Sequence, residues 1–357
     1  MNRTFSIADV TIAGRVLTAP MSGVSDLPFR RAASKLGAPY VVTEMVACET
    51  LAQGRPDVVR RAAGGEGQAL MVIQLAGREA HWMAKGAAMA DAAGAHIIDL
   101  NMGCPAKQVT GGLCGSALMR DLDQAERLID ATVGATCRPV TLKMRLGWDD
   151  ASKNAPELAA RAERAGVKAI TVHARTRQQF YNGSANWRAV AAVKAATKLP
   201  VIVNGDIVDA ASAREALAQS GADAVMIGRG ACGRPWMAAA LDHALSSGGA
   251  MTEPNLAERL DIALDHLQGS LRFYGDGLGL KTFRKHLGWY VEGAPWPLSA
   301  IARRAAKARL CRLNDPRELE AALIALWDRR QCDDERRSDG LGARQWLADD
   351  GRLPQPA

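Results

Sequence analysis

One thiol stands where an enzyme would hold a reactive group. Cys104 belongs to the segment Asn101-Met102-Gly103-Cys104-Pro105, which follows the apolar run His96–Leu100. A short β-rich run bounded by Gly and Pro predicts a parallel strand, and the carboxyl ends of such strands face ligands in α/β folds. A cysteine of ordinary pKa, about 8.5, can deliver a proton at neutral pH. The sequence therefore predicts Cys104 at the mouth of an active site.

Polar residues also follow the other apolar runs of the chain. They are Ala19-Pro20-Met21-Ser22, Gln74, Lys143-Met144-Arg145, His173-Ala174-Arg175, Asn204-Gly205-Asp206 and Gly228-Arg229-Gly230. Residues two apart on a strand lie on the same side, so Lys143 pairs with Arg145 and His173 with Arg175. We expect four donors to converge on one mouth.

Two glycine-containing loops, Asn204-Gly205-Asp206 and Gly228-Arg229-Gly230, come late in the chain. In barrels the last loops commonly bind phosphate, since small residues let backbone N–H groups approach an anion. The alternative is that each glycine only turns the chain after a strand. Both loops together, with Arg229, favour a phosphorylated cofactor.

Each remaining candidate has a structural alternative. Lys143 could form a buried ion pair instead of stabilising charge on a reduced cofactor, and His173 could be a core histidine bonded to backbone. Asn101 and Gln74 suit hydrogen bonding to a flat heterocycle. Buried inert thiols are predicted at four cysteines, and packing at Cys114. The four are Cys48, Cys137, Cys232 and Cys311.

Eight apolar, β-branched runs alternate with amphipathic stretches and must position these residues. They are Val16–Ala19, Tyr40–Thr43, Leu70–Leu75, His96–Leu100, Val140–Met144, Ala169–Val172, Val201–Val203 and Ala224–Ile227. Eight βα units predict a closed (β/α)8 TIM barrel over residues 12–248. An open doubly wound sheet is the weaker alternative, because no Gly-x-Gly-x-x-Gly follows the first strand.

The alternation stops after about Gly249. Residues 252–330 show helical periodicity with breaks at Pro295, Pro297 and Pro316, which predicts an all-α domain of about four helices. The last segment, 331–357, carries a charge run and a Pro-rich end, and we expect it to be disordered.

Composition sets the broad class of the protein. The chain has 357 residues, of which 48% are hydrophobic and 23% charged. It has no uninterrupted apolar stretch of membrane-spanning length and no signal-peptide pattern near Met1, so we expect a cytoplasmic protein without membrane contact. Its seven cysteines form no Cys-x-x-Cys pair, so neither a disulfide framework nor a metal site is predicted. We expect a monomer.

Basic residues gather in the predicted helical domain. The net charge is +7 with a pI near 9.2, which permits a polyanionic partner. Trp289 and Tyr290 lie among the basic residues, as in nucleic-acid-binding surfaces. An ordinary solvated helix face with two core aromatics is the alternative. The basic residues are Lys281, Arg284, Lys285, Arg303, Arg304, Lys307, Arg309 and Arg312.

Over residues 12–330 the chain resembles bacterial tRNA-dihydrouridine synthases, most closely the B type. The motifs that carry the resemblance are Ala19-Pro20-Met21, Ser25-Asp26-Leu27-Pro28-Phe29-Arg30, Asn101-Met102-Gly103-Cys104-Pro105, Lys143-Met144-Arg145-Leu146-Gly147-Trp148, His173-Ala174-Arg175-Thr176-Arg177, Asn204-Gly205-Asp206 and Gly228-Arg229. In this order the combination is highly specific. The chain departs from the B type at Thr110-Gly111-Gly112, where a more polar loop is usual, and at Ala174, where glycine is common.

The resemblance implies an FMN-binding barrel that uses NADPH to reduce uridines of tRNA to 5,6-dihydrouridine, with a helical domain that grips tRNA. Hydride passes from flavin N5 to carbon 6 of uracil, and Cys104 matches the donor of the proton to carbon 5. The flavin residues by motif position are Pro20, Met21, Ser22, Gln74, Lys143, His173, Asn204, Gly205, Asp206, Gly228 and Arg229. Those matching the uracil zone are Asn101, Arg145 and Arg175.

Two other functions compete with this one. A dihydroorotate-dehydrogenase-like enzyme would share the barrel, FMN and a pyrimidine ring, but the basic C-terminal domain argues against a free small substrate. A non-catalytic RNA-binding barrel would be colourless when purified, and Lys143 and Cys104 argue against it.

Overall fold

The computed structural model describes residues 4–64, 68, 70–296 and 298–327. It divides into two compact units, which meet in the sequence at Glu253 and Pro254. The predicted tail 331–357 and the break at Pro297 lie outside the described residues.

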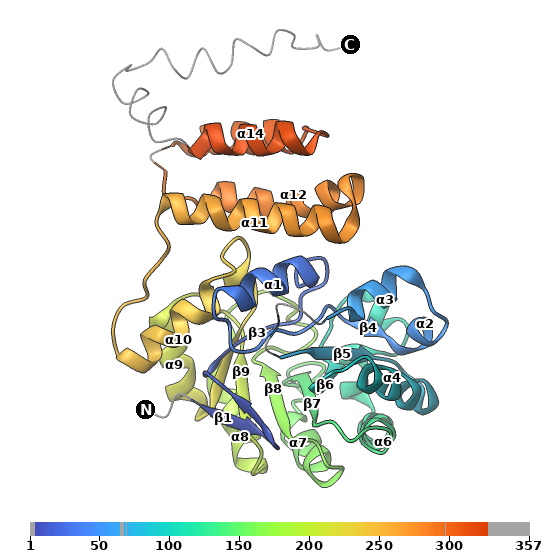
Figure 1. The fold of residues 1–357 in the computed structure, drawn as a ribbon. Coiled ribbons are helices and arrows are strands. Elements are labelled where there is room, and N and C mark those ends of the chain that lie inside the picture. The colour runs from blue at the N-terminus through green and yellow to red at the C-terminus, as the bar shows by residue number, and fades with distance from the viewer. Residues whose placement is uncertain (1–3, 65–67, 69, 297, 328–357) are drawn as a thin grey trace, which may run out of the picture. The chain divides into compact units, whose positions relative to one another are not determined.

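The first unit contains ten strands in its described part. They are β1 (Phe5–Ile7), β2 (Val10–Ile12), β3 (Val16–Thr18), β4 (Val46–Ala47), β5 (Val72–Ala76), β6 (Ile97–Met102), β7 (Val140–Arg145), β8 (Ala169–His173), β9 (Val201–Asn204) and β10 (Ala224–Ile227). β3 to β10 form one sheet of parallel pairs in the order β3-β10-β9-β8-β7-β6-β5-β4. Helices surround these strands (Figure 1).

The helices of this unit follow the strands in alternation. They are α1 (Leu27–Lys35), α2 (Cys48–Ala52), α3 (Pro56–Ala62), α4 (Ala80–Ala92), α5 (Lys107–Thr110), α6 (Leu122–Val133), α7 (Ala155–Arg164), α8 (Val190–Ala196), α9 (Ala210–Ser220) and α10 (Met237–Ser247). Local sequence sets their ends: α9 begins with a capping box of Asp209 and Ser212 and ends at Gly221, whose φ is +64°. The predicted (β/α)8 barrel with a helical C-terminal region is confirmed.

The second predicted strand, Tyr40–Thr43, is wrong as a regular strand. Two isolated parallel bridges, Thr18 to Val41 and Val42 to Val72, join β3 to β5 here, and β4 follows as a short extra strand. The side-chain hydroxyl of Thr43 accepts the N–H of Gln74 at 3.0 Å. Because this side chain takes the place of a main-chain acceptor, the backbone hydrogen-bond ladder between this segment and β5 is interrupted.

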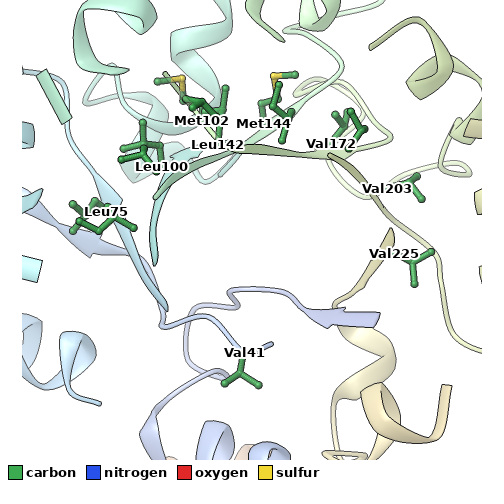
Figure 2. Packing of buried hydrophobic residues seen from close by; sticks show 14 of the residues in the cluster. Val41, Leu75, Leu100, Met102, Leu142, Met144, Val172, Val203 and Val225 are labelled. Carbon is green, nitrogen blue, oxygen red and sulfur yellow. The ribbon is translucent and has the colours of Figure 1, made fainter. Parts of the chain in front are cut away.

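Successive side chains along each strand point to opposite faces and so form two apolar cores, an inner one inside the barrel and an outer one between the strands and the helices. Ile98, Leu100 and Met102 of β6 belong to the cluster between strands and helices, and Figure 2 shows several of its members along successive strands. Ile97 belongs to the inner cluster, which also holds Ile7 and Ile12 of the β1–β2 hairpin. Sequence patterns did not predict this hairpin, whose two isoleucines are at most 1% exposed.

The second unit contains four helices in its described part. They are α11 (Leu256–Tyr274), α12 (Asp276–Gly293), α13 (Ala300–Leu310) and α14 (Pro316–Trp327). α11 and α12 lie side by side and bury Leu267, Phe283 and Leu287 (Figure 1). Nowhere in the ranges described above is a helix both long and apolar enough to cross a bilayer.

Candidate active site

The carboxyl ends of β6 to β9 bring the predicted polar residues into two adjacent layers. In the parallel register Asn101 lies opposite Lys143, Arg145 opposite His173, and His173 opposite Asn204. Five of the predicted residues, three of the four expected donors among them, thus lie at neighbouring strand ends.

Cys104 lies on a loop that is held from both sides. The side-chain oxygen of Asn101 accepts the backbone N–H of Cys104 at 3.0 Å and that of Gly103 at 3.3 Å. Ser116 donates its N–H (3.1 Å) and its hydroxyl (2.9 Å) to the Cys104 carbonyl. Gly115, with φ +60°, packs so closely that a Cβ would lie 2.8 Å from that carbonyl oxygen. The half-buried thiol is thus placed by a rigid loop.

Gln74 lies inside the barrel and links two other side chains. Its Nε2 donates to Asp99 at 2.7 Å, and its Oε1 accepts from Asn101 at 2.7 Å. Thr141 donates its hydroxyl to the second oxygen of Asp99 at 2.6 Å. Burial raises the pKa of Asp99 to about 6, although the bonds from Thr141 and Gln74 and the nearby Lys143 oppose the shift.

Lys143 is a cation in the barrel interior. Its Nζ donates to Asn204 Oδ1 at 3.0 Å, and Asn204 Nδ2 in turn donates to the Met226 carbonyl at 2.8 Å. Burial lowers the pKa of Lys143 to about 8, while Asp99 and an ionised Cys104 would raise it. Lys143 can therefore hold a positive charge beside Cys104 at neutral pH.

Arg145 is buried and its guanidinium is bonded to loop carbonyls. It donates to Gly103 (2.8 Å), Thr176 (2.8 Å) and Phe180 (2.9 Å). Burial lowers its pKa to about 10, so it stays charged. In this structure Arg145 ties the loop before Cys104 to the loop after β8.

Arg175, the other predicted substrate contact, is only 1% exposed. Its guanidinium binds both oxygens of Asp206 at 2.9 and 2.5 Å and the carbonyls of Asn182 and Gly183. The Arg175 ion pair and the weaker contact with Arg229 lower the pKa of Asp206 against the effect of burial. The structure therefore places Arg175 beneath the loops as a support for Asp206.

His173 lies next to these cations. Burial lowers its pKa well below the usual value, and Arg145, Lys143, Arg175 and Arg229 add to the shift. A neutral imidazole is the result at neutral pH, so His173 can exchange hydrogen bonds with a ligand but adds no charge.

The predicted phosphate loops and the end of β3 lie close together. Gly205 has φ +123°, and a Cβ there would lie 3.0 Å from the His173 ring. At Gly228 a Cβ would lie 3.9 Å from Ala19 and from the Met21 sulfur, an ordinary contact distance. Of the other residues predicted here, Ser22 and Arg229 are exposed, and Pro20 is half-buried.

Sequence reasoning missed two residues of this site. Asp99 precedes Asn101 by two positions on β6, and this spacing on one strand face was the available signal. Tyr181 lies on the loop after β8, where Arg229 and Arg145 approach its ring at 5.0 and 5.6 Å and His173 at 6.2 Å. An exposed aromatic pair, Phe180 and Tyr181, was its signal.

Of the four thiols predicted to be buried, only Cys48 is fully so. Cys48 is buried, Cys232 and Cys311 are half-buried, but Cys137 is exposed because it lies on the surface turn before β7. Burial raises the pKa of Cys48 to about 12 and that of Cys232 to about 11, as expected of inert thiols. Burial also raises the pKa of Cys114.

The basic residues of the helical unit differ in their exposure. Arg303 donates to the carbonyls of Ala294 (2.5 Å) and Trp296 (2.6 Å), and Tyr290 is buried with its hydroxyl 3.1 Å from His266. Tyr290 is therefore a core aromatic, as in the alternative of an ordinary solvated helix face, and not part of a nucleic-acid-binding surface. Exposed basic residues are Lys281, Lys285, Arg304, Arg309 and Arg312.

The dihydrouridine synthase (Dus) family model matches residues 17–323. The chain belongs to the dihydrouridine synthase family. A probable tRNA-dihydrouridine synthase of Rhodobacter capsulatus is 50% identical over 92% of this chain and 99% of its own length. A tRNA-dihydrouridine synthase B of Xanthomonas campestris is 44% identical, over 81% of this chain and 87% of its own. This dihydrouridine synthase family member is therefore an oxidoreductase enzyme, which excludes a non-catalytic RNA-binding barrel.

Solved structures share the fold of this family member at low identity. 2-Naphthoyl-CoA reductase matches with a TM-score of 0.52 and 12% identity over 69% of this chain and 52% of its own. Histamine dehydrogenase from Rhizobium sp. 4-9 matches with a TM-score of 0.52 and 14% identity over 74% and 50%. These likenesses concern the barrel fold.

Proposed function

We propose that this chain reduces specific uridines of tRNA to 5,6-dihydrouridine, with bound FMN and with NADPH as reductant, and that it does so as a cytoplasmic monomer. Family membership and the relatives named as tRNA-dihydrouridine synthases support the substrate. The observation that carries the mechanism is Cys104, half-buried on a rigid loop beside Lys143 and Arg145.

The residues at the strand ends fit a flavin. Lys143 supplies a cation in the interior, which suits the electron-rich edge of a reduced ring system, and His173 supplies a neutral hydrogen-bonding group. The backbone at Gly228 has no close neighbour that would block an anion, since a Cβ there would meet other atoms only at ordinary contact distance. Together with the exposed guanidinium of Arg229, this suits a phosphate. When bound, FMN would supply the hydride for the uracil ring.

The protein's own task is to complete the reduction with a proton. Hydride addition at carbon 6 leaves negative charge on the uracil, so an acid must protonate carbon 5 from a fixed position. Cys104 is that acid in our proposal, and Lys143 and Arg145 stabilise the developing charge. Asn101 holds the Cys104 loop, and Arg175 holds Asp206 and the loop after β8.

A direct assay tests the proposal. Purified protein with FMN, NADPH and an unmodified tRNA transcript should form dihydrouridine, measured by mass spectrometry of nuclease digests and mapped by position. A free pyrimidine such as orotate or dihydroorotate should not react. Turnover of the free pyrimidine without modification of tRNA would instead support the dihydroorotate-dehydrogenase-like alternative.

FMN affinity should depend on pH through Lys143. Because burial lowers its pKa to about 8, Lys143 loses its charge as the pH rises through 8, and a ligand that prefers the cation then binds less tightly. We expect FMN to bind about eightfold more weakly at pH 9 than at pH 7.5. Fluorescence titration of the flavin-free protein measures this. In Lys143→Met the affinity should be low and nearly constant, and an unchanged alkaline decrease would assign the effect to another group.

Binding of tRNA should be strongly salt-dependent. The target uridine must leave its stack to reach the barrel, so the rest of the tRNA has to be held by its backbone. We propose that the helical unit does this with its exposed basic residues, of which Arg304 and Arg309 lie on α13, a helix that contains no acidic residue. Affinity should fall about tenfold or more between about 50 and 200 mM salt.

Charge reversal at single sites localises this effect. Arg304→Glu, on the exposed face of α13, should weaken tRNA binding. The slope of log affinity against log salt concentration should become shallower by about the amount that one phosphate contact contributes. Lys168→Glu is the matched control, because Lys168 is exposed just before the amino end of β8. Filter binding at several salt concentrations measures both. Equal effects of the two variants would mean that α13 has no special part in binding.

A further inference from the structure

A continuous line of hydrogen bonds runs from the barrel interior to the loop of Cys104. Asp99 accepts from Gln74 at 2.7 Å, Gln74 accepts from Asn101 at 2.7 Å, and Asn101 accepts the N–H of Cys104 at 3.0 Å. We call these four residues the relay. Each link is a short, direct contact between neighbouring groups.

The two ends of the relay fix its direction. An ionised carboxylate has no proton to donate, so Gln74 must turn its amide nitrogen toward Asp99 and its oxygen toward Asn101. A backbone N–H can only donate, so Asn101 must turn its oxygen toward Cys104. Both amides therefore have one orientation that satisfies every link, set at the interior end by the Asp99 carboxylate and at the loop end by the Cys104 N–H.

The inner part of the relay is shielded from water and mounted on rigid strands. Asp99 is 4% exposed and Gln74 1% exposed. Gln74 on β5 lies directly opposite Asp99 on β6, and Asp99 lies opposite Thr141 on β7. Thr141 occupies the second oxygen of Asp99. Water has little access to replace a missing link, so removal of one acceptor should disturb the groups beyond it.

We propose that Asp99 is a positioning residue, which acts through Gln74 and Asn101 to fix the loop that presents Cys104. The inference deepens the proposed function, on which it rests. Asp99 takes no part in the proton transfer itself, and its effect is on where the thiol lies.

The competing role for Asp99 is that of a counter-charge for Lys143, with which it interacts electrostatically. The two roles respond differently to Asp99→Asn. An asparagine can still accept from Gln74 with its oxygen while its nitrogen donates to the Thr141 hydroxyl, so the relay keeps its direction without the charge. Asp99→Leu, which also branches at Cγ, removes the charge and both acceptors.

The first experiment compares these two variants in the holoenzyme. In Asp99→Leu, reduction of the flavin by NADPH should stay within about twofold, and dihydrouridine formation by the pre-reduced enzyme should slow at least about tenfold, since small misplacement of a reacting group is costly. Asp99→Asn should stay within about threefold of wild type. Thr18→Val, a buried β3 hydroxyl outside the relay, is the control and should match wild type. Equal losses in Asp99→Asn and Asp99→Leu, or loss of bound flavin in either, would overturn the proposal.

A second readout does not depend on the reaction. Alkylation of Cys104 by iodoacetamide, followed by peptide mass spectrometry, should be at least about threefold faster in Asp99→Leu, because a loosened loop exposes the half-buried thiol. The exposed Cys137 serves as an internal reference and should react equally in all variants. If wild type makes no dihydrouridine, the proposed function fails, yet this rate still decides the inference. Unchanged Cys104 alkylation in Asp99→Leu would refute it.

A polarity swap keeps the test decisive if Asp99→Leu does not fold. Gln74→Glu places two carboxylates face to face and should slow dihydrouridine formation at least about tenfold. Asp99→Asn together with Gln74→Glu restores a donor opposite an acceptor, since the new carboxylate at position 74 would then accept from both neighbouring amides. The double variant should recover most of the lost rate, and because both proteins carry the same substitution at position 74, they differ only at position 99. A double variant no faster than the single one would refute the relay.

Discussion

Cys104→Ala should bind FMN as wild type does and accept electrons from NADPH within about twofold, yet form dihydrouridine about 10²- to 10⁴-fold more slowly, the range for loss of a general acid. The reason is the position of the thiol, half-buried on the loop that Asn101 and Ser116 hold. Stopped-flow flavin absorbance and mass spectrometry of tRNA measure the two half-reactions separately.

The same loop offers a matched control. Cys114 is a half-buried cysteine ten positions later, and Cys114→Ala removes the same atom without touching the Asn101 bond. It should keep dihydrouridine formation within about threefold of wild type. If Cys104→Ala formed product at the wild-type rate, or if Cys114→Ala lost as much, Cys104 would not be the proton donor.

Arg175→Leu should have the largest effect on folding stability. It breaks a two-point ion pair between the buried Arg175 and the half-buried Asp206, and it removes the donor to the carbonyls of Asn182 and Gly183. Loss of one partner of a fully buried pair lowers the free energy of unfolding by about 3–5 kcal/mol, and because Asp206 is partly exposed we expect the lower end, about 3 kcal/mol. For a unit of this size the melting temperature should fall by roughly 10 °C, measured by differential scanning calorimetry on the flavin-free protein.

Arg229 provides the comparison, because it contacts the same carboxylate from the surface. Its side chain is 64% exposed and lies 3.3 Å from Asp206. Arg229→Leu should therefore change the free energy of unfolding by less than about 1 kcal/mol. Equal losses of stability in the two variants would show that burial does not set the strength of the Arg175 pair.

Much of the barrel follows from local sequence. Seven of the eight predicted runs are strands, because alternating apolar side chains such as Ile97 and Ile98 face two different cores. Tyr40–Thr43 differs because the Thr43 hydroxyl interrupts the ladder, a tertiary detail that no periodicity encodes. The β1–β2 hairpin was missed because each of its three-residue strands has a polar residue in the middle, so neither forms an apolar run like that of β3.

The sequence predicted where the residues of the site lie, but not what most of them bind. Asn101, Lys143 and His173 lie at strand ends, as the barrel rule requires. The engagement of Arg145 and Arg175 could not be foreseen, since most of their partners are loop carbonyls brought near by the fold. No residue type marks a backbone carbonyl as a partner. Spacing therefore locates a cation, whereas only the structure shows what it binds.

The β1–β2 hairpin has one more consequence. Ile7 and Ile12 pack into the inner cluster with Leu17 and Ile97. Apolar side chains therefore fill the barrel interior at the end where the hairpin lies. Ligands can therefore enter the barrel from one end only. Under the proposed mechanism, substrate entry, product exit and reprotonation of Cys104 all take place through the opposite end, and we expect passage through that end to limit turnover.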